Sequence, residues 1–316
     1  MVVTMPFDTR VKAALDQPRT GWRAYLPAAD TLNFVLTNHV PRALLTYAMG
    51  WFSRVRSPGL TRISVALWQR WSDLDLSEAA PGPYRSLRDV FTRALRPGAR
   101  PFDDDPDVLC SPCDAIVGAC GPVLGTQAWQ AKGLTYRLEE LMGPRAAARY
   151  TDGHFVTLRL TATMYHRFHA PADMHVHHVH YISGDAFNVN PAAVRRIPRL
   201  FCRNERALVE ATLQGAGHDI ALVPVAAILV ASIRLHFVDV TLHLRWRGAH
   251  DIPCDAHVAR GEELGWFEHG STILMFVPRG WTLATGIEPG RVIRAGQALW
   301  RRASASGVLQ DSSTDV

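Results

Sequence analysis

Lysine is almost absent from this chain of 316 residues, in which Lys12 and Lys132 are the only two. Lysine and arginine together number 34, so arginine carries nearly all of the positive charge, and 29 acidic residues leave a net charge of +5. The planar guanidinium group binds phosphate and carboxylate groups through two parallel hydrogen bonds. The composition therefore favours anionic partners, and its 47% of hydrophobic residues is typical of a globular protein.

The chain also lacks an apolar run long enough to span a bilayer. The longest, residues 220–232, is shorter than the roughly 20 residues that a spanning helix needs and contains Pro224, so we expect two buried strands there. The first residues do not have the pattern of a secretory signal. Five cysteines, an odd number, favour reduced thiols in a cytosolic compartment. The CxxC spacing of Cys110 and Cys113 occurs once, which gives little support to a zinc or redox site.

Acidic residues are missing from residues 31–72. Two helices are expected there, over residues 43–55 and from Pro58 onward, because apolar side chains recur on one face of the second. Arginine and tryptophan without acidic residues are typical of a helix on an anionic membrane surface, although buried core helices have similar patterns. The side chains expected at such a surface are Arg42, Trp51, Phe52, Arg54, Arg56, Arg62, Trp68, Arg70 and Trp71.

A further helix is predicted to begin at Ser86, whose spacing to Asp89 is that of a capping box, and to end before Pro97. After Pro101 the sequence consists of short β-rich runs separated by glycine and proline, with one more helix over residues 138–142. The fold class expected is therefore α+β, with N-terminal helices followed by a mainly β domain.

Four short stretches contain side chains capable of chemistry. They are SPCDAIVG, MYHRFHAP, NER and EHGST, at residues 111–118, 164–171, 204–206 and 268–272. Each has an ordinary structural explanation as well. Asp114 can cap a turn, and His166 and His169 can be partly buried strand or turn residues. Gly270 and Ser271 are common in a tight turn before a strand.

A histidine-rich run, MHVHHVH, occupies residues 174–180. Side chains alternate along a strand, which predicts His175 and His177 on one face and His178 and His180 on the other. A metal site could use only some of these imidazoles. We therefore expect no metal, and a zinc hydrolase built on this run is kept as an alternative.

Taken together, the four stretches resemble the phosphatidylserine decarboxylase family in their order and spacing. Three supporting stretches are similar to the same family, namely FTRALRPGARPF, KGLTYRLEELMG and GEELGWFEHGST, at residues 91–102, 132–143 and 261–272. The likeness extends over about residues 26–301. It implies that N-terminal membrane-associated helices, residues 1–75, precede a mainly antiparallel β catalytic domain, residues 76–316.

The resemblance implies self-cleavage between Gly270 and Ser271. In the family this serine becomes a pyruvoyl group, the one cofactor expected. Its ketone forms a Schiff base with phosphatidylserine and accepts the electrons released as CO₂ leaves, which gives phosphatidylethanolamine. The resemblance assigns the base for cleavage to His169, oriented by Asp114, and the later protonation of the product carbon to His166.

The partners implied are phosphatidylserine and an anionic membrane surface, with the enzyme peripheral on the cytoplasmic face of the cell membrane. Cleavage would leave a heterodimer of β and α chains, whose further dimerisation is left open, and no nucleic acid is expected. Ala115, Met164 and His269 depart from the family pattern and leave the rate of maturation open.

Two alternatives accompany this interpretation. One is a pyruvoyl-dependent decarboxylase of another amino-acid-containing substrate, which would have no use for the acid-free segment. The other is a non-catalytic lipid-binding homologue, although the proposed reacting groups Asp114, His166, His169 and Ser271 are all present.

Overall fold

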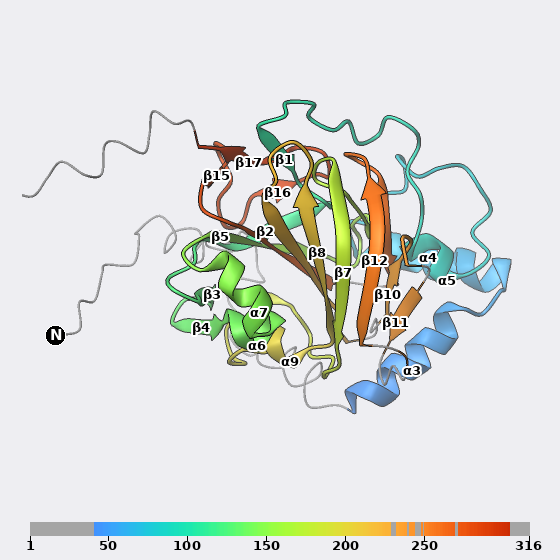
Figure 1. Cartoon of the computed structure of the whole chain (residues 1–316). Helices are drawn as coiled ribbons and strands as arrows, with labels where there is room; N and C mark the ends of the chain where they lie inside the picture. The colour runs from blue at the N-terminus through green and yellow to red at the C-terminus, as the bar shows by residue number, and fades with distance from the viewer. Residues whose placement is uncertain are drawn as a thin grey trace, which may run out of the picture.

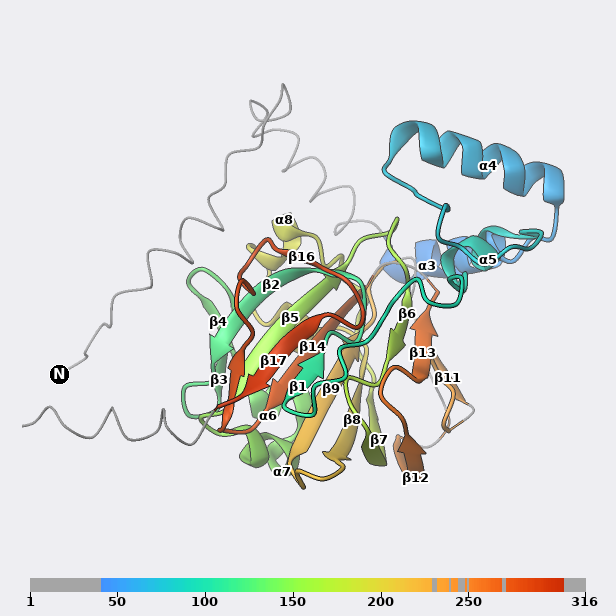
Figure 2. The same cartoon turned by 90° about the horizontal axis from the view of Figure 1, so that it is seen from above.

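The computed structural model of the chain describes residues 41–228, 232–238, 240–243, 248, 250–268 and 271–303. A large antiparallel sheet lies at the centre, with smaller sheets against one face and short helices against the other (Figure 1). Helices from the N-terminal part of the described chain lie at one side of these layers (Figure 2). The expected mainly antiparallel β architecture is confirmed, and the boundary between residues 75 and 76 stays a prediction.

The large sheet has eight strands in the order β12-β7-β8-β9-β14-β5-β2-β16, and its neighbouring strands are antiparallel. The strands are β2 (Ala115–Pro122), β5 (His154–Leu160), β7 (Met174–Ile182), β8 (Arg206–Leu213), β9 (Asp219–Val225), β12 (Asp251–Val258), β14 (Ser271–Val277) and β16 (Val292–Ile293). β14 is buried at every residue, because both of its faces are covered and its sequence after the first two residues is continuously apolar.

Two smaller sheets cover one face of the large sheet, with strand orders β11-β10-β13-β6 and β1-β17-β15. Their strands are β1 (Val108–Cys110), β6 (Arg167–His169), β10 (Ser232–Leu235), β11 (Val240–His243), β13 (Glu263–Phe267), β15 (Trp281–Leu283) and β17 (Ala298–Arg302). Phe168, Phe267 and Trp300 from these sheets share one core with Ile273 of β14. The stretch 164–171 and Ser271, the first residue of β14, thus lie at this interface between sheets.

The opposite face of the large sheet is covered by helices and a hairpin. These are α6 (Leu138–Met142), α7 (Pro144–Ala147), η2 (Ala148–Tyr150), α8 (Pro191–Val194), α9 (Leu200–Arg203) and the hairpin of β3 (Gln127–Ala131) and β4 (Leu134–Arg137). Tyr150 and Phe201 pack in one core with Leu274 and Phe276 of β14. The helix predicted at residues 138–142 is α6.

The N-terminal helices are α3 (Arg42–Ser53), α4 (Pro58–Trp71) and α5 (Leu87–Phe91). The predicted capping box of Ser86 is present at the start of α5. The helix is shorter than predicted, because it ends at Phe91 and not close to Pro97. Leu95 instead forms an antiparallel bridge with Ala79, which takes the backbone out of the helix.

The predicted arrangement of the histidine-rich run is wrong. The pairing of β7 with β8 shifts register between Val176 and His178, which is the signature of a β-bulge. The extra residue resets the alternation, so His175, His177, His178 and His180 all lie on the outward face of β7 while the apolar residues between them are buried. A bulge of this kind depends on pairing with neighbouring strands and has no simple signal in the sequence.

The longest apolar run, residues 220–232, forms most of β9 and reaches only Ser232, the first residue of β10, so the described residues contain one of the two buried strands predicted within it. Of the helices in the described ranges, none combines the length and the apolar character that crossing a membrane requires.

Candidate active site

Ser271 is the first residue of β14, the strand between β5 and β9. Its partner on β5 is Leu160, and alternation places its side chain in the core that contains Ile273. The side chain is fully buried, and no described residue gives Oγ a hydrogen bond. A buried hydroxyl without a partner is destabilising, which marks Ser271 as a candidate for function. Gly270, and with it the predicted cleavage bond, lies outside the described residues, as does His269.

His166 lies immediately before β6 and is fully buried. Its carbonyl accepts a hydrogen bond of 3.0 Å from Phe267 N–H, at the end of β13 and just upstream of Ser271. Its ring centroid lies 5.8 Å from that of Phe91 on α5. The fold therefore brings His166 to the segment that leads into Ser271.

His169 lies at the end of β6, with Nδ1 2.9 Å from Gly261 O and Nε2 2.9 Å from Tyr165 Oη. Because a carbonyl only accepts, Nδ1 carries the proton, and Nε2 accepts from the tyrosine hydroxyl. Burial lowers the pKa of His169 below its usual value of about 6.5, more than the nearby carbonyl and carboxylates raise it. A neutral imidazole is the form that can act as a base near neutral pH.

Asp114 was expected to contact His169, and the structure corrects that contact. Its carboxylate binds Arg100 through Nε and Nη2 at 2.8 and 2.6 Å, and it accepts a third hydrogen bond of 2.9 Å from Ala295 N–H. The backbone nevertheless places the two segments side by side, because His169 N–H donates to Pro112 O at 2.8 Å. Asp114 thus acts on His169 through its charge, which favours the protonated ring.

Glu268 lies just before the predicted cleavage site and is 97% buried, with 3% of its surface exposed. One carboxylate oxygen lies 3.0 Å from Nη2 of Arg54, at the end of α3, and the other lies 2.8 Å from Nε of Arg88, in α5. Two arginines from the helical segment therefore fix the chain shortly before Ser271. A buried carboxylate needs such partners, since an unpaired charge in the interior is strongly destabilising.

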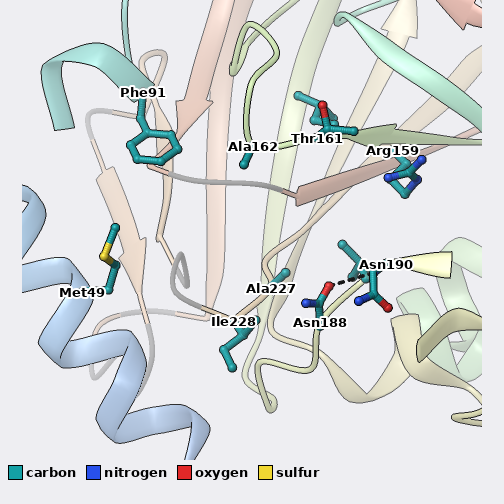
Figure 3. A pocket seen from close by; sticks show the side chains of 11 residues that line it. Met49, Phe91, Arg159, Thr161, Ala162, Asn188, Asn190, Ala227 and Ile228 are labelled. Carbon is teal, nitrogen blue, oxygen red and sulfur yellow. Dashed lines mark hydrogen bonds between the residues drawn. The ribbon is translucent and has the colours of Figure 1, made fainter. Parts of the chain in front are cut away.

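A cavity of about 300 Å³ opens beside the start of β14 (Figure 3). It includes Leu160, the partner of Ser271, and extends to Met49 of α3 and Phe91 of α5. The full lining is Met49, Phe91, Arg159, Leu160, Thr161, Ala162, Asn188, Val189, Asn190, Ala227 and Ile228. The cavity therefore connects the N-terminal helices with the end of the strand that carries Ser271.

Sequence reasoning did not single out the polar residues of this region. Arg159 lines the cavity from β5, and Tyr165 binds His169. The sequence did contain one signal for Arg159. It is a charged residue in the mostly buried strand HFVTLRL, and charged residues are rare inside buried strands unless they have a specific role. Tyr165 lay within a quoted stretch, and its role depends on the fold of β6.

The NER stretch has mainly structural contacts. Asn204 donates to Phe187 O and Ala226 O at 2.8 and 2.9 Å, and Arg206 donates only to backbone carbonyls. Glu205 accepts a hydrogen bond of 2.5 Å from a tyrosine hydroxyl, and burial raises its pKa to about 7. The stretch therefore anchors the start of β8 in the interior.

The outward histidines of β7 lie apart from Ser271. Ligand atoms of His175, Asp255 and His257 come within 4.8 Å of one another at the β7–β12 edge, on the face of the sheet opposite to the Ser271 side chain. His180 pairs with another carboxylate of β12 at 2.7 Å. A metal ion held by these residues would lie on the other face of the sheet from the Ser271 side chain. A zinc hydrolase, the alternative that the sequence left open, would therefore use a different site from Ser271.

Two of the residues predicted at a membrane surface have partners inside the protein. Arg42 makes hydrogen bonds of 3.0 and 2.7 Å with Asp185, and Arg54 binds Glu268. Trp68 packs against Phe91 with ring centroids 4.6 Å apart. The other six predicted residues are exposed, and they are Trp51, Phe52, Arg56, Arg62, Arg70 and Trp71.

The fold and the site define a mainly antiparallel β protein with a buried serine at the start of β14 and two histidines, one just before β6 and one at its end, in the smaller sheet packed against it. The family model described as phosphatidylserine decarboxylase matches residues 87–301, and the chain belongs to the phosphatidylserine decarboxylase family.

Curated relatives carry the name phosphatidylserine decarboxylase proenzyme. The protein of Halorhodospira halophila is 38% identical over 282 residues, which covers 86% of this chain and 94% of the relative. That of Shewanella baltica is 34% identical over 282 residues, with 85% and 96% covered. That of Brevibacillus brevis is 32% identical over 273 residues, with 84% and 95% covered.

Proposed function

We propose that this protein decarboxylates phosphatidylserine to phosphatidylethanolamine after it cleaves its own chain between Gly270 and Ser271. The observation that carries the proposal is the buried Ser271, whose Oγ has no hydrogen-bond partner among the described residues and which lies beside a cavity. Membership of the family and the relatives' name, which includes the word proenzyme, support it.

Self-cleavage begins when Ser271 Oγ loses its proton and attacks the carbonyl carbon of Gly270. The bond from that carbon to the Ser271 nitrogen breaks, which converts the amide into an ester and leaves an amine. Loss of the Ser271 Cα proton then expels Gly270 as a carboxylate and leaves dehydroalanine. Water replaces the nitrogen, so the products are a pyruvoyl group and ammonia.

His169 is the base in this proposal, because its lowered pKa keeps it neutral and the lone pair of its Nε2, which accepts a hydrogen bond from Tyr165, can take up a proton. Gly261 O and Tyr165 orient the ring, and Asp114 stabilises the charge that the ring gains. This arrangement replaces a direct carboxylate-to-imidazole hydrogen bond with two other orienting contacts.

A pyruvoyl group at residue 271 fits its surroundings, since the buried serine hydroxyl has no competing partner in the described chain and the group would begin the shorter fragment. When formed, it supplies the ketone that draws electrons from the substrate as CO₂ leaves. His166, which is buried and whose carbonyl binds Phe267 just upstream of Ser271, holds the proton for the decarboxylated carbon. The apolar cavity wall at Met49 and Phe91 excludes water from this proton transfer.

The exposed faces of α3 and α4 are proposed to lie on an anionic membrane, on the cytoplasmic side. Leu60, Ile63, Leu67 and Trp71 recur along one face of α4 and are 40%, 61%, 57% and 84% exposed. The cavity reaches Met49 of α3, so a lipid headgroup could pass from that surface to the site. Residues 1–270 and 271–316 would remain associated as a heterodimer through the paired strands β5, β14 and β9.

Purified protein tested with phosphatidylserine vesicles should release CO₂ and form phosphatidylethanolamine, whereas Ser271→Ala should do neither. Free amino acids are tested in parallel, because the alternative enzyme would decarboxylate a soluble amino acid and not the lipid. Activity on a free amino acid and none on the lipid would refute the proposed substrate. Lipid binding without CO₂ release would favour the non-catalytic homologue.

A further inference from the structure

Arg159 is a guanidinium without a counter-ion in the part of the chain that the structure describes. It lies near the end of β5, half-buried, and no described carboxylate is within ion-pair distance. Burial lowers its pKa, and no neighbouring charge opposes that effect. By contrast, Arg100 and Arg167 are both paired with carboxylates.

Two threonine hydroxyls lie on the same face of the sheet as Arg159. Thr272 is its direct partner across the β5–β14 ladder, and Thr157 precedes it by one alternation of β5, so the three side chains point to the same side. Thr272 and Thr157 are only 1% and 4% exposed, and neither Oγ1 has a hydrogen-bond partner in the described ranges. One cation and two hydroxyl donors therefore converge without an acceptor.

A cavity of about 200 Å³ lies over these three side chains. Gly118 also lines it, and a Cβ there would come within 3.2 Å of the Thr157 side chain. Arg159 and Val189 line both this cavity and the larger one beside Ser271, so the two spaces meet at the guanidinium. These three side chains lie on the face of the large sheet opposite to the Ser271 side chain, so the group that Arg159 binds would lie around the start of β14 from residue 271.

An oxyanion satisfies all three groups at once. A buried cation and buried hydroxyls are destabilising when left without partners, and guanidinium forms its strongest hydrogen bonds with oxyanions. The proposed substrate carries two such groups, a carboxylate and a phosphodiester. The carboxylate must leave as CO₂, and an ion pair that stabilises it before reaction would raise the barrier. The phosphodiester stays through the reaction, so it can be held throughout.

We infer that Arg159, Thr157 and Thr272 form a subsite for the phosphodiester of the lipid headgroup, an assignment that rests on the proposed function. The phosphate lies across Thr272, and the headgroup extends around the start of β14 toward residue 271 through the cavities that share Arg159. Arg159 is then a specificity-determining residue that separates phospholipid from free amino acid.

Binding is measured by calorimetry on the Ser271→Ala protein, which does not turn over, with glycerophosphoserine as the probe. Replacing Arg159 with Gln should weaken binding by about tenfold or more, because a hydrogen-bonded charge is lost. Thr157→Val, which keeps the shape and removes the hydroxyl, should weaken it by a few fold. Arg279→Gln, an exposed arginine that follows the far end of β14, is the matched control and should leave the affinity unchanged.

Free L-serine and inorganic phosphate identify the group bound. Phosphate that competes with glycerophosphoserine only when Arg159 is present supports the subsite. L-serine that binds as tightly as glycerophosphoserine and depends on Arg159 would assign the guanidinium to the carboxylate and overturn the inference. Equal affinity of glycerophosphoserine for the parent and Arg159→Gln proteins would overturn it as well.

The stability and kinetics of Arg159→Gln distinguish a binding role for Arg159 from a purely structural one. These measurements use the protein with Ser271 intact. Because Arg159→Gln removes a half-buried charge that has no described partner, its melting temperature should be no lower than that of wild type. Intact mass should show that its chain is still cut completely. With Ser271 intact, its KM for phosphatidylserine should rise more than its kcat falls. A lower melting temperature with unchanged KM would refute the subsite. Failure of the wild-type chain to be cut would refute the proposed function and leave the binding result standing on its own.

Discussion

At the residue scale, His166 and His169 are three positions apart and lie in different surroundings. His169 has both ring nitrogens in hydrogen bonds, whereas His166 is fully buried beside Phe91, and its carbonyl binds the segment that leads into Ser271. The proposed roles follow from this difference, since a base must be oriented before cleavage and a proton donor must face the product. The sequence predicted the two residues through the family resemblance, but the partners Tyr165 and Gly261 are set by tertiary structure.

The two histidines can be separated by substitution. His169→Ala should accumulate uncut chain, because the proposed base for Ser271 is removed. His166→Ala should be cut and then fail to release phosphatidylethanolamine, because the carbon that loses CO₂ is not protonated. Intact mass and product assay on the same samples measure both. An uncut His166→Ala protein together with a fully cut His169→Ala protein would reverse the assignment.

Maturation should also depend on pH through His169. Its pKa is lowered from about 6.5, so the ring is neutral at pH 7 and becomes protonated only as the pH falls below 6.5. The rate of cleavage after rapid dilution from denaturant should therefore be constant from pH 8 to about pH 6.5 and decline below. Replacing Asp114 with Asn should move the decline to lower pH, since Asp114 favours the charged ring. A decline centred above pH 7 would contradict the assignment of His169.

Glu205 gives a stability prediction at the same scale. Burial raises its pKa from 4.5 to about 7, so the folded state binds its proton more tightly than the unfolded state does. The advantage is complete below pH 4.5 and disappears as the pH rises to about 7, which corresponds to about 3 kcal/mol of unfolding free energy. Glu205→Gln should show no such loss, so its stability relative to wild type should increase between pH 4.5 and 7.5. Urea unfolding at several pH values tests this, and parallel curves for the two proteins would contradict it.

At the scale of elements, α3 and α5 are connected to the cleavage segment through Glu268. Arg54 and Arg88 hold this carboxylate, while the β14 ladder holds Ser271, so the short chain between them is fixed at both ends. Arg88→Gln should slow self-cleavage by roughly tenfold, in keeping with the loss of a charged hydrogen bond to a buried carboxylate. Mass spectrometry over time measures this.

Controls separate the clamp from a general loss of fold. Arg88→Lys should restore part of the cleavage rate, and Arg62→Gln, in the same helical region, should have no effect on it. Equal cleavage rates for wild type and Arg88→Gln would show that the ion pair does not position the cleavage segment.

The proposed membrane binding involves the same helices and rests on fewer exposed arginines than the sequence indicated. Arg42 and Arg54 are occupied by Asp185 and Glu268, and Arg56, Arg62 and Arg70 remain exposed. Each contributes on the order of 1 kcal/mol near an anionic surface. Replacing the three with Gln should weaken flotation with anionic vesicles, and high salt should have the same effect on wild type.

Trp71→Ser provides the complementary change, because it removes apolar contact without changing charge. It should weaken binding to anionic and neutral vesicles alike. Wild-type binding that is equal on neutral and anionic vesicles at every salt concentration would contradict the electrostatic part of this account.

Helices were predicted from sequence more accurately than strand details. Capping at Ser86 and the apolar face of α4 are local features, so the sequence contains them directly. The bulge at His178 and the end of α5 at Phe91 depend on pairing with distant strands and bridges. The same dependence on pairing explains why the four histidines of β7, which were predicted on two faces, share one face in the fold.

At the scale of the whole molecule, the fold brings distant stretches of sequence to one place. The turn before Asp114, the β6 segment with His169 and the start of β14 with Ser271 meet around the interface between the large and small sheets. The resemblance predicted these residues together. It did not predict the cavity wall from Met49 or the subsite at Arg159, because both depend on packing between elements.

The central claim is that the chain cuts itself at Ser271 and converts that residue. Intact mass spectrometry of the purified full-length protein tests it most directly, with Ser271→Ala as the control. The account predicts two fragments, residues 1–270 and 271–316, with the shorter one lighter by one ammonia than simple hydrolysis would leave it. The control should remain a single chain. A wild-type protein that decarboxylates phosphatidylserine while it remains one uncut chain would contradict the account.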